Sequence, residues 1–251
     1  MRVTILGSGT STGVPEIGCS CDVCKSENPK DKRLRASVLV ETGSENLLID
    51  CGPDFRYQML RNRTTAVDAL LITHIHYDHI GGLDDLRPFC KEQAFPVFAE
   101  KRVTDALREK YSYIFQDHRY PGVPDINLIT IHRNPFQIGN TEIIPIRLFH
   151  YKLPVLGFRI GDFAYLTDFT TLPEAEMVKL EGVRVVIMEA LRKTPHMSHL
   201  SLGEALEIAS KLNAEQIVLT HISHQMGMHE EVNKELPDGV SLGYDRMTLS
   251  F

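Results

Sequence analysis

The segment that most constrains this chain is His74-Ile75-His76-Tyr77-Asp78-His79, where four ligand-type side chains fall within six residues. It follows the short apolar run 69–72, which is typical of a buried strand, and it precedes Gly81-Gly82, which let a helix pack closely. Imidazoles with one carboxylate favour zinc, iron or manganese over calcium. One tetrahedral ion cannot easily take all four ligands from so tight a loop. The spacing therefore predicts two adjacent ions, one on His74 and His76 and the other on Asp78 and His79.

Three further ligand-type residues stand where predicted strands end. The strand-like segments 143–149, 163–167 and 215–220 lead to His150, Asp168 and His221. His74, Asp168 and His221 share one layout, an apolar run and then a threonine directly before the ligand. Because strand ends of a layered α/β fold project to one rim, we expect these side chains to meet the 74–79 segment there.

A second group of ligand-type residues contains Cys19, Cys21 and Cys24. Cys19 and Cys21 are too close in sequence for an unstrained disulfide, so reduced surface thiols and a zinc site are the two alternatives. A closed zinc site needs a fourth ligand, and His224, three residues after His221, can supply it. We expect a structural zinc on Cys19, Cys21, Cys24 and His224.

The glycine-rich stretch 7–13 superficially resembles a dinucleotide-binding turn. Its glycine spacing is wrong by one residue, and Val14-Pro15 stands where a helix should begin. A loop that allows close backbone approach to the metal site or substrate is the better interpretation.

The remaining pattern alternates strands with helices, which predicts one α/β domain over residues 1–251. Segments 36–42 and 46–50 read as a hairpin, and residues 53–63 and 100–110 as helices. Capping-box patterns at Thr171 and Ser201 mark two further helix starts. His118, His132 and His229 have no role in this scheme, so we expect them at the surface.

Composition excludes some classes of protein. The 251-residue chain has a net charge of −6, which argues weakly against a nucleic-acid binder that depends on bulk positive charge. No apolar run approaches the roughly 20 residues of a membrane span. The N-terminal segment lacks the features of a signal peptide, so a cytoplasmic location with reduced cysteines is expected.

The H-x-H-x-D-H segment after a buried strand resembles the signature of the metallo-β-lactamase superfamily. That resemblance implies an αββα four-layer sandwich with a one- or two-metal hydrolytic site. The cysteine cluster and the Thr220-His221-Ile222-Ser223-His224 stretch resemble one branch closely, the phosphoribosyl 1,2-cyclic phosphate phosphodiesterases of phosphonate breakdown. The match spans nearly the whole chain.

The resemblance also implies a ligand set. His74, His76 and His150 would hold one ion, Asp78, His79 and His221 the other, and Asp168 would bridge them. Asp50 would support the metal loops without binding metal. In such pairs, ~3.5–4 Å apart, a shared water loses a proton near neutral pH and the metal-bridging hydroxide is the nucleophile. Two catalytic manganese or zinc ions and one structural zinc are expected.

Two residues have predicted catalytic roles besides metal binding. Asp78 would orient the hydroxide. His199 lies just before the predicted helix at Ser201, and the resembled branch has a functional histidine at the matching place. It is the candidate for phosphate contact or general acid, and His196 is the competing choice.

These inferences favour a phosphodiesterase that hydrolyses a small, cyclic phosphate diester. The alternatives are a nuclease similar to the tRNA 3′-processing endonucleases and a thioester hydrolase similar to glyoxalase II. No basic insertion of the tRNA-clamping kind is evident. The family implies a homodimer. The exact ester, the native metal and the loops that set specificity, with 84–95 and 112–127 as candidates, stay open.

Overall fold

The strands of the computed structural model, which describes residues 1–118 and 120–251, form two seven-stranded sheets. The first has the order β14 (Thr248–Ser250), β1 (Arg2–Gly7), β2 (Ser37–Glu41), β3 (Asn46–Ile49), β4 (Ala69–Leu71), β5 (Phe95–Glu100) and β6 (Ile126–Ile131). The second has the order β13 (Val240–Leu242), β12 (Gln216–Thr220), β11 (Val185–Glu189), β10 (Phe163–Leu166), β9 (Leu153–Ile160), β8 (Thr141–His150) and β7 (Phe136–Ile138). The strands from β1 to β6 therefore form the first sheet and those from β7 to β13 the second, and β14 alone returns to the first sheet.

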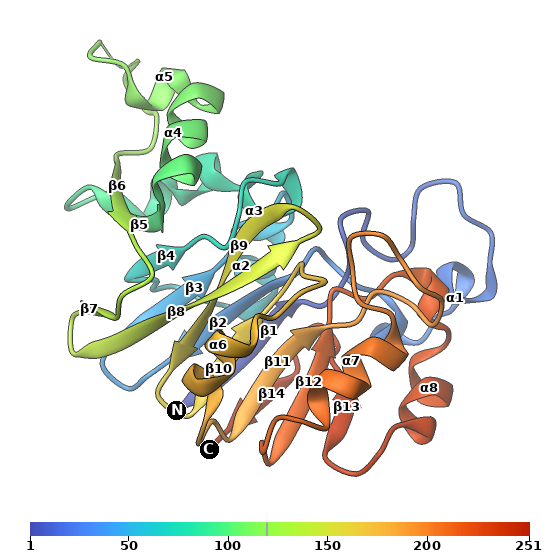
Figure 1. Cartoon of the computed structure of the whole chain (residues 1–251). Helices are drawn as coiled ribbons and strands as arrows, with labels where there is room; N and C mark the ends of the chain where they lie inside the picture. The colour runs from blue at the N-terminus through green and yellow to red at the C-terminus, as the bar shows by residue number, and fades with distance from the viewer. Residues whose placement is uncertain (119) are drawn as a thin grey trace.

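The two sheets face each other across a buried apolar layer, and helices cover their outer faces (Figure 1). Helices on the first sheet are α2 (Phe55–Asn62), α3 (Tyr77–Ile80), α4 (Lys101–Lys110) and α5 (Ser112–Phe115), with the 3₁₀ helix η2 (Leu83–Phe89). Helices on the second sheet are α6 (Glu174–Met177), α7 (Leu202–Ala209) and α8 (His229–Glu235), with η3 (Val178–Leu180). The short α1 (Asp22–Lys25), η1 (Pro29–Asp31) and η4 (His224–Met226) lie in connecting loops. This is the αββα sandwich that the sequence predicts.

Strand direction decides where the functional side chains emerge. β3, β4 and β5 run parallel in the first sheet, and β10, β11 and β12 run parallel in the second. β8 runs in the same direction as β10, because β9 lies between them and is antiparallel to both. The carboxyl ends of β8, β10, β11 and β12 therefore reach one edge of the second sheet.

Most local predictions from the sequence are confirmed. The hairpin β2–β3 and the helices α2 and α4 are present, and Ser201 and Glu204 form a capping box at α7. The capping box at Thr171 is wrong, because α6 starts after Pro173 with no side-chain cap. The expected loop at 112–127 contains α5 and the start of β6, and residue 119 within it lies outside the described part.

The prediction that His229 lies at the surface is also wrong, whereas His118 and His132 are exposed as expected. His229 is 2% exposed and its Nδ1 accepts a hydrogen bond from the buried Arg33 at 3.2 Å. Arg33 also donates to the Ser8 hydroxyl at 2.9 Å. A buried guanidinium needs such acceptors because an unpaired one is costly. This polar network ties the glycine-rich loop to α8. Within the described residues, no helix is long and apolar enough to cross a membrane.

Candidate metal centre

The ends of strands from both sheets bring the predicted ligands together. His221 directly follows β12, Asp168 is the second residue after β10, and His74 is the third residue after β4. Asp78 and His79 lie in α3. Ligand atoms of Asp78, His79, Asp168 and His221 all lie within 4.8 Å of one another, as do those of His74, His76 and Asp168. Asp168 belongs to both groups. This is the position that a ligand shared by two ions would need, and the roles of these residues as metal ligands stay predictions.

Short contacts converge on the Asp168 carboxylate. Its Oδ1 lies 3.1 Å from His221 Nε2 and 3.4 Å from His79 Nε2, and its Oδ2 lies 3.5 Å from His74 Nε2. Asp78 Oδ2 lies 3.1 Å from His79 Nε2. The two carboxylates therefore face the same imidazole nitrogens from different sides.

His150 joins the cluster from β8. Its Nδ1 lies 2.6 Å from the carbonyl oxygen of Ser198, which fixes the ring. Its ligand atom groups with those of Asp168 and His199, and its ring centroid lies 5.2 Å from that of His76. The structure thus places His150 between the predicted first-ion ligands and His199.

A buried carboxylate holds the α3 loop from behind. Asp50 is 0% exposed. It accepts hydrogen bonds from the Thr73 backbone and hydroxyl at 2.9 Å each, and its Oδ2 lies 2.7 Å from His79 Nδ1. A carboxylate on one ring nitrogen orients the other toward a metal. Asp50 therefore has the supporting geometry that the sequence predicts.

The glycine after α3 is needed for space. A Cβ on Gly82 would lie 2.3 Å from the carbonyl oxygen of Gly52, a distance that atoms cannot adopt without a shift in the backbone. The close packing of the helix on the backbone beneath it, predicted from Gly81-Gly82, is therefore confirmed at Gly82.

The backbone is strained where the ligands emerge. Asp50, Asp168 and His221 have φ values of 63°, 51° and 57°, in the left-handed region that costs non-glycine residues of order 1–3 kcal/mol each. All three follow the end of a strand. The left-handed conformation directs these three side chains toward the candidate metal centre. The strain therefore accompanies the placement of the site residues.

Electrostatics favour ionised carboxylates in the cluster. Burial alone would raise the pKa of Asp168, but His221 and His79 outweigh it and hold that pKa well below its usual range. Burial likewise lowers the pKa of His74. Burial would lower the pKa of His79 and His221, but Asp168 outweighs it and raises both. A divalent transition-metal ion would take the place of these protons between the same carboxylate and imidazole donors.

Unpartnered polar atoms test whether an ion fits. Among the described residues, His79 Nε2 and both ring nitrogens of His221 are buried without a hydrogen-bond partner. Buried polar atoms normally find partners. An ion beside Asp78 and Asp168 would provide one for the Nε2 atoms of His79 and His221, which face these carboxylates at 3.1–3.5 Å. The residues present therefore fit a divalent metal ion.

Glu189 is a residue that our sequence reasoning missed. It ends β11, is 0% exposed, and its Oε2 lies 3.0 Å from His199 Nδ1. The His199 ring stacks on His221 with centroids 5.0 Å apart. Burial and the neighbouring His221 lower the pKa of His199 to about 4, so its imidazole is neutral near pH 7. The apolar run 185–188 before Glu189 carries the same strand-end signal as the other ligands.

His196, the competing choice, lies farther from the cluster. Its Nδ1 accepts a hydrogen bond from the Ser198 backbone at 3.3 Å, and its ring centroid lies 5.2 Å from that of His199. The geometry therefore favours His199 as the histidine that faces the site.

The cysteine cluster forms a separate group of metal-type ligands. Ligand atoms of Cys19, Cys21, Cys24 and His224 lie within 4.8 Å of one another. His224 Nδ1 is 3.4 Å from Cys19 Sγ and 3.3 Å from Cys21 Sγ, and this contact lowers the pKa of Cys21 to about 6. Glu16, which the sequence analysis did not single out, lies 3.2 Å from His224 Nε2 and can orient that ring.

Comparison with known families agrees with this geometry. Residues 45–222 match the family model described as a β-lactamase superfamily domain. The chain belongs to this superfamily. It has the metallo-β-lactamase fold, a fold that implies divalent metal ions.

Among curated proteins, the chain is 42% identical over 248 residues to a protein named octanoyltransferase from Porphyromonas gingivalis (strain ATCC BAA-308 / W83). The match covers 98% of this chain and 50% of that protein. The chain therefore spans about half the length of this relative, whose name describes a protein twice as long.

Among solved structures, the chain is similar to a diphosphatase of the PhnP family, with 39% identity and a TM-score of 0.93 over 100% of this chain and 97% of that one. Zinc-bound PqqB of Methylobacterium extorquens has a TM-score of 0.80 at 19% identity, and each chain is covered completely. At that identity the second likeness shows the fold alone.

Proposed function

We propose that this protein is a dimetal phosphodiesterase that hydrolyses a small, cyclic phosphate diester. The observation that supports this best is the Asp168 carboxylate, which lies within 3.5 Å of imidazole nitrogens from His74, His79 and His221. A carboxylate so placed is suited to be shared by two ions. The likeness to a PhnP-family diphosphatase supports a phosphoryl substrate.

His74, His76 and His150 would hold one manganese or zinc ion, and Asp78, His79 and His221 the other, with Asp168 common to both. Bound divalent ions would supply a water that is acidic near neutral pH and positive charge for phosphoryl oxygens. His76 is exposed while the other members of this set are buried. The substrate would therefore approach from the side of His76.

The residues around the ions have positioning roles. Asp50 would fix the His79 ring through Nδ1, and Ser198 would fix the His150 ring through its carbonyl oxygen. Asp78 would accept a hydrogen bond from the attacking water and orient it. Rings locked in this way lower the cost of reorganisation when charge develops on phosphorus.

His199 would complete the site on the leaving-group side. Glu189 contacts its Nδ1, so its Nε2 is the nitrogen available to substrate. The neutral tautomer with its proton on Nε2 would hydrogen-bond the phosphoryl group or pass that proton to the departing oxygen. The buried Glu189 would receive or return the corresponding proton at Nδ1.

A diphosphate is the second candidate substrate, because the solved structure at 39% identity carries the name diphosphatase. Hydrolysis of a P–O–P bond needs the same phosphoryl contacts and differs in the leaving group. Bis-p-nitrophenyl phosphate and a ribose cyclic phosphate would report diesterase activity, and ADP-ribose would report diphosphatase activity.

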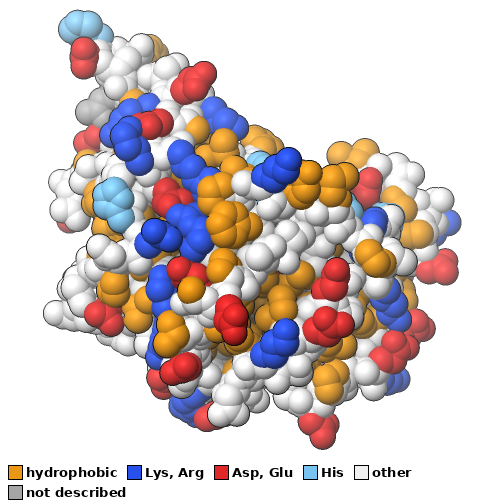
Figure 2. Space-filling model, in the orientation of Figure 1, with side chains coloured by type: hydrophobic (Ala, Val, Ile, Leu, Met, Phe, Trp, Pro, Cys, Tyr) orange, Lys and Arg blue, Asp and Glu red, His pale blue; other side chains and the backbone are white. Residues whose placement is uncertain are grey.

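Two other classes have weaker support. Acyl-thioester hydrolysis is considered because a relative carries the name octanoyltransferase, but the match covers only half of that protein. Nucleic-acid cleavage is less favoured, because Lys and Arg are interspersed with Asp and Glu on the face shown in Figure 2 and the net charge is −6.

The test is a substrate panel assayed with purified protein in manganese, zinc and chelator. We expect hydrolysis of a cyclic or linear phosphodiester that chelation abolishes and metal restores. Turnover of ADP-ribose alone would replace the diesterase by the diphosphatase. Turnover of an acyl thioester alone, or of no substrate under any metal, would contradict the proposal.

We also propose that Cys19, Cys21, Cys24 and His224 hold a structural zinc. Three thiols and one imidazole form a closed four-ligand set with no position left for substrate. The zinc would tie the loop before α1 to η4, three residues after His221. It would thereby support the end of a strand that carries a catalytic ligand.

A further inference from the structure

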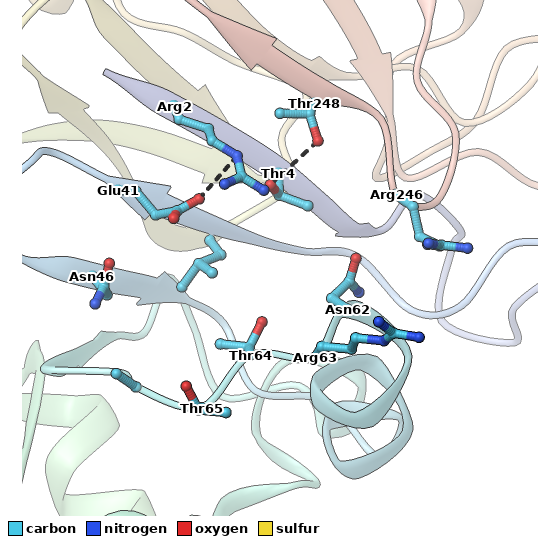
Figure 3. A pocket seen from close by; sticks show the side chains of 12 residues that line it. Arg2, Thr4, Glu41, Asn46, Asn62, Arg63, Thr64, Thr65, Arg246 and Thr248 are labelled. Atoms are coloured by element: carbon cyan, nitrogen blue, oxygen red, sulfur yellow. Dashed lines mark hydrogen bonds and ion pairs between the residues drawn. The ribbon is translucent and has the colours of Figure 1, made fainter.

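A polar groove lies on the outer face of the first sheet, beside the end of α2 (Figure 3). Its cavity volume is about 350 Å³. The lining includes Arg2 at the start of β1, Asn46 at the start of β3, and residues 64–66 in the loop before β4. Asp50 and His74 follow the opposite ends of the parallel strands β3 and β4. The groove is therefore separate from the metal centre.

The groove carries an excess of positive charge. Arg2, Arg63 and Arg246 line it together with one carboxylate, Glu41. Arg2 pairs with Glu41 at 3.3 Å. Within the described part of the chain, Arg63 and Arg246 have no carboxylate partner. The two guanidiniums are exposed at the groove, so an anion entering it would meet donors that no side chain neutralises.

Hydroxyl and amide groups supply the rest of the lining. Thr4, Thr64, Thr65 and Thr248 contribute hydroxyls, and Asn46 and Asn62 contribute side-chain amides. Thr4 Oγ1 lies 3.5 Å from Thr248 Oγ1 on the floor of the groove. Guanidiniums surrounded by hydroxyls and amides are suited to the many acceptor oxygens of a phosphate.

Two of the arginines, Arg63 and Arg246, have a backbone conformation that arginine rarely adopts. Arg63 ends α2 with φ 54°, and Arg246 has φ 73°. Both values lie in the left-handed region, where glycine or asparagine is preferred. The fold alone would favour glycine at these positions. Backbone geometry therefore gives no reason for an arginine at either position, and each one places a guanidinium at the groove.

We propose that this groove binds the phosphate group of a small phosphorylated molecule such as a nucleotide. Arg63 and Arg246 would donate to the phosphate oxygens, and the threonine hydroxyls would complete the contacts. Glu41 holds Arg2 at the rim. The cavity volume matches the lower end of small-molecule sites, about 300–1,000 Å³. The inference does not depend on the proposed hydrolase activity.

Glycine substitutions separate binding from folding. Arg63→Gly and Arg246→Gly remove a guanidinium but suit the left-handed backbone, so the thermal midpoint of unfolding should not fall. Arg108→Ala is the matched control, because this arginine is exposed on α4 and outside the groove. Asp168→Ala removes binding at the metal centre and should leave the groove intact.

The experiment is calorimetric titration of the metal-loaded protein with AMP, inorganic phosphate and sulfate. Wild type, Arg108→Ala and Asp168→Ala should bind AMP in the groove, and each glycine variant should weaken that binding about tenfold or more. Hydrolase kinetics of the glycine variants should stay unchanged. If the glycine variants bind as wild type does, or if Asp168→Ala abolishes all AMP binding, the proposal is overturned. Equal binding of sulfate would overturn the assignment to phosphate.

Discussion

The two groups of metal-type ligands in this molecule are held in different ways. The histidines and aspartates of the candidate metal centre, called the catalytic group for their proposed role, emerge from strand ends in both sheets. Asp168, His79 and His221 are at most 1% exposed. The cysteine group lies in a loop with a small apolar cluster around Val14, Val23 and Cys24. The first site is therefore shaped by the whole fold, whereas the second depends on few contacts.

This difference predicts different responses to loss of metal. The strand ends of the catalytic group are fixed by ladder hydrogen bonds and by Asp50, so the site should keep its shape without ions. The cysteine loop has little burial of its own, so its ion should contribute to local stability. Four changes test this contrast, in order of expected effect.

The largest effect should follow Asp168→Ala, because this carboxylate faces both halves of the catalytic group. We expect kcat/KM to fall by roughly 10³-fold or more, corresponding to loss of several kcal/mol of charge stabilisation. Asp162→Ala is the control, since Asp162 is exposed at the turn before β10. Activity and metal content measured together should fall only in the first variant. Unchanged metal content would mean that Asp168 is not a ligand.

His199→Ala should lower kcat by about 100-fold, the scale of general acid–base catalysis, and should leave the metal content unchanged. His196→Ala is the matched control in the same loop. A Glu189→Gln substitution should give a smaller loss through the His199 ring, on the order of 10-fold. Equal losses in the His196 and His199 variants would assign both histidines to loop structure rather than to the reaction.

His229 tests the polar network that ties the glycine-rich loop to α8. Burial and the adjacent Arg33 lower the pKa of His229 to about 4, against about 6.5 in an unfolded chain. Between these values the unfolded chain binds a proton that the folded chain excludes, so the free energy of unfolding falls as pH drops through this window.

Replacement by glutamine keeps an acceptor for Arg33 and removes the titration. The stability of His229→Gln relative to wild type should improve by about 2 kcal/mol between about pH 7.5 and about pH 5. Chemical denaturation of both proteins at the two pH values measures this. A difference that does not change with pH would show that His229 is accessible to protons in the folded protein.

Cys24→Ser should have the smallest effect on turnover. We expect less than about 10-fold loss in kcat, together with faster proteolysis within residues 16–28, because the loop loses its ion but the strand ends do not. Cys90→Ser, a thiol outside the cluster, is the control. Loss of all activity in Cys24→Ser would show that the two sites are not independent.

The sequence was most informative where ligand chemistry coincided with strand ends. His74, Asp168 and His221 each follow an apolar run and a threonine. Residues after the carboxyl ends of parallel strands lie at the same edge of the sheet, so their meeting could be expected. The full set of candidate ligands and the αββα layers were expected because the H-x-H-x-D-H segment resembles the metallo-β-lactamase signature, and the layers are confirmed. The residues that meet at the centre could therefore be named without coordinates.

Other features depend on long-range contacts that no local pattern records. Glu189 acquires its role only because His199, ten residues later, returns to the end of β11. His229 resembles a surface histidine until Arg33 packs beside it. The left-handed backbone at Asp50, Asp168 and His221 is fixed by the surrounding sheets, since none of these residues is glycine.

Metal content per chain, measured on wild type and on two variants by mass spectrometry of the folded protein, tests the central contrast most directly. Wild type should hold about three ions, Cys24→Ser about two and Asp168→Ala about one. This pattern would place a pair of ions at the strand ends and a single ion in the cysteine loop. One ion in wild type, or equal counts in all three proteins, would contradict it.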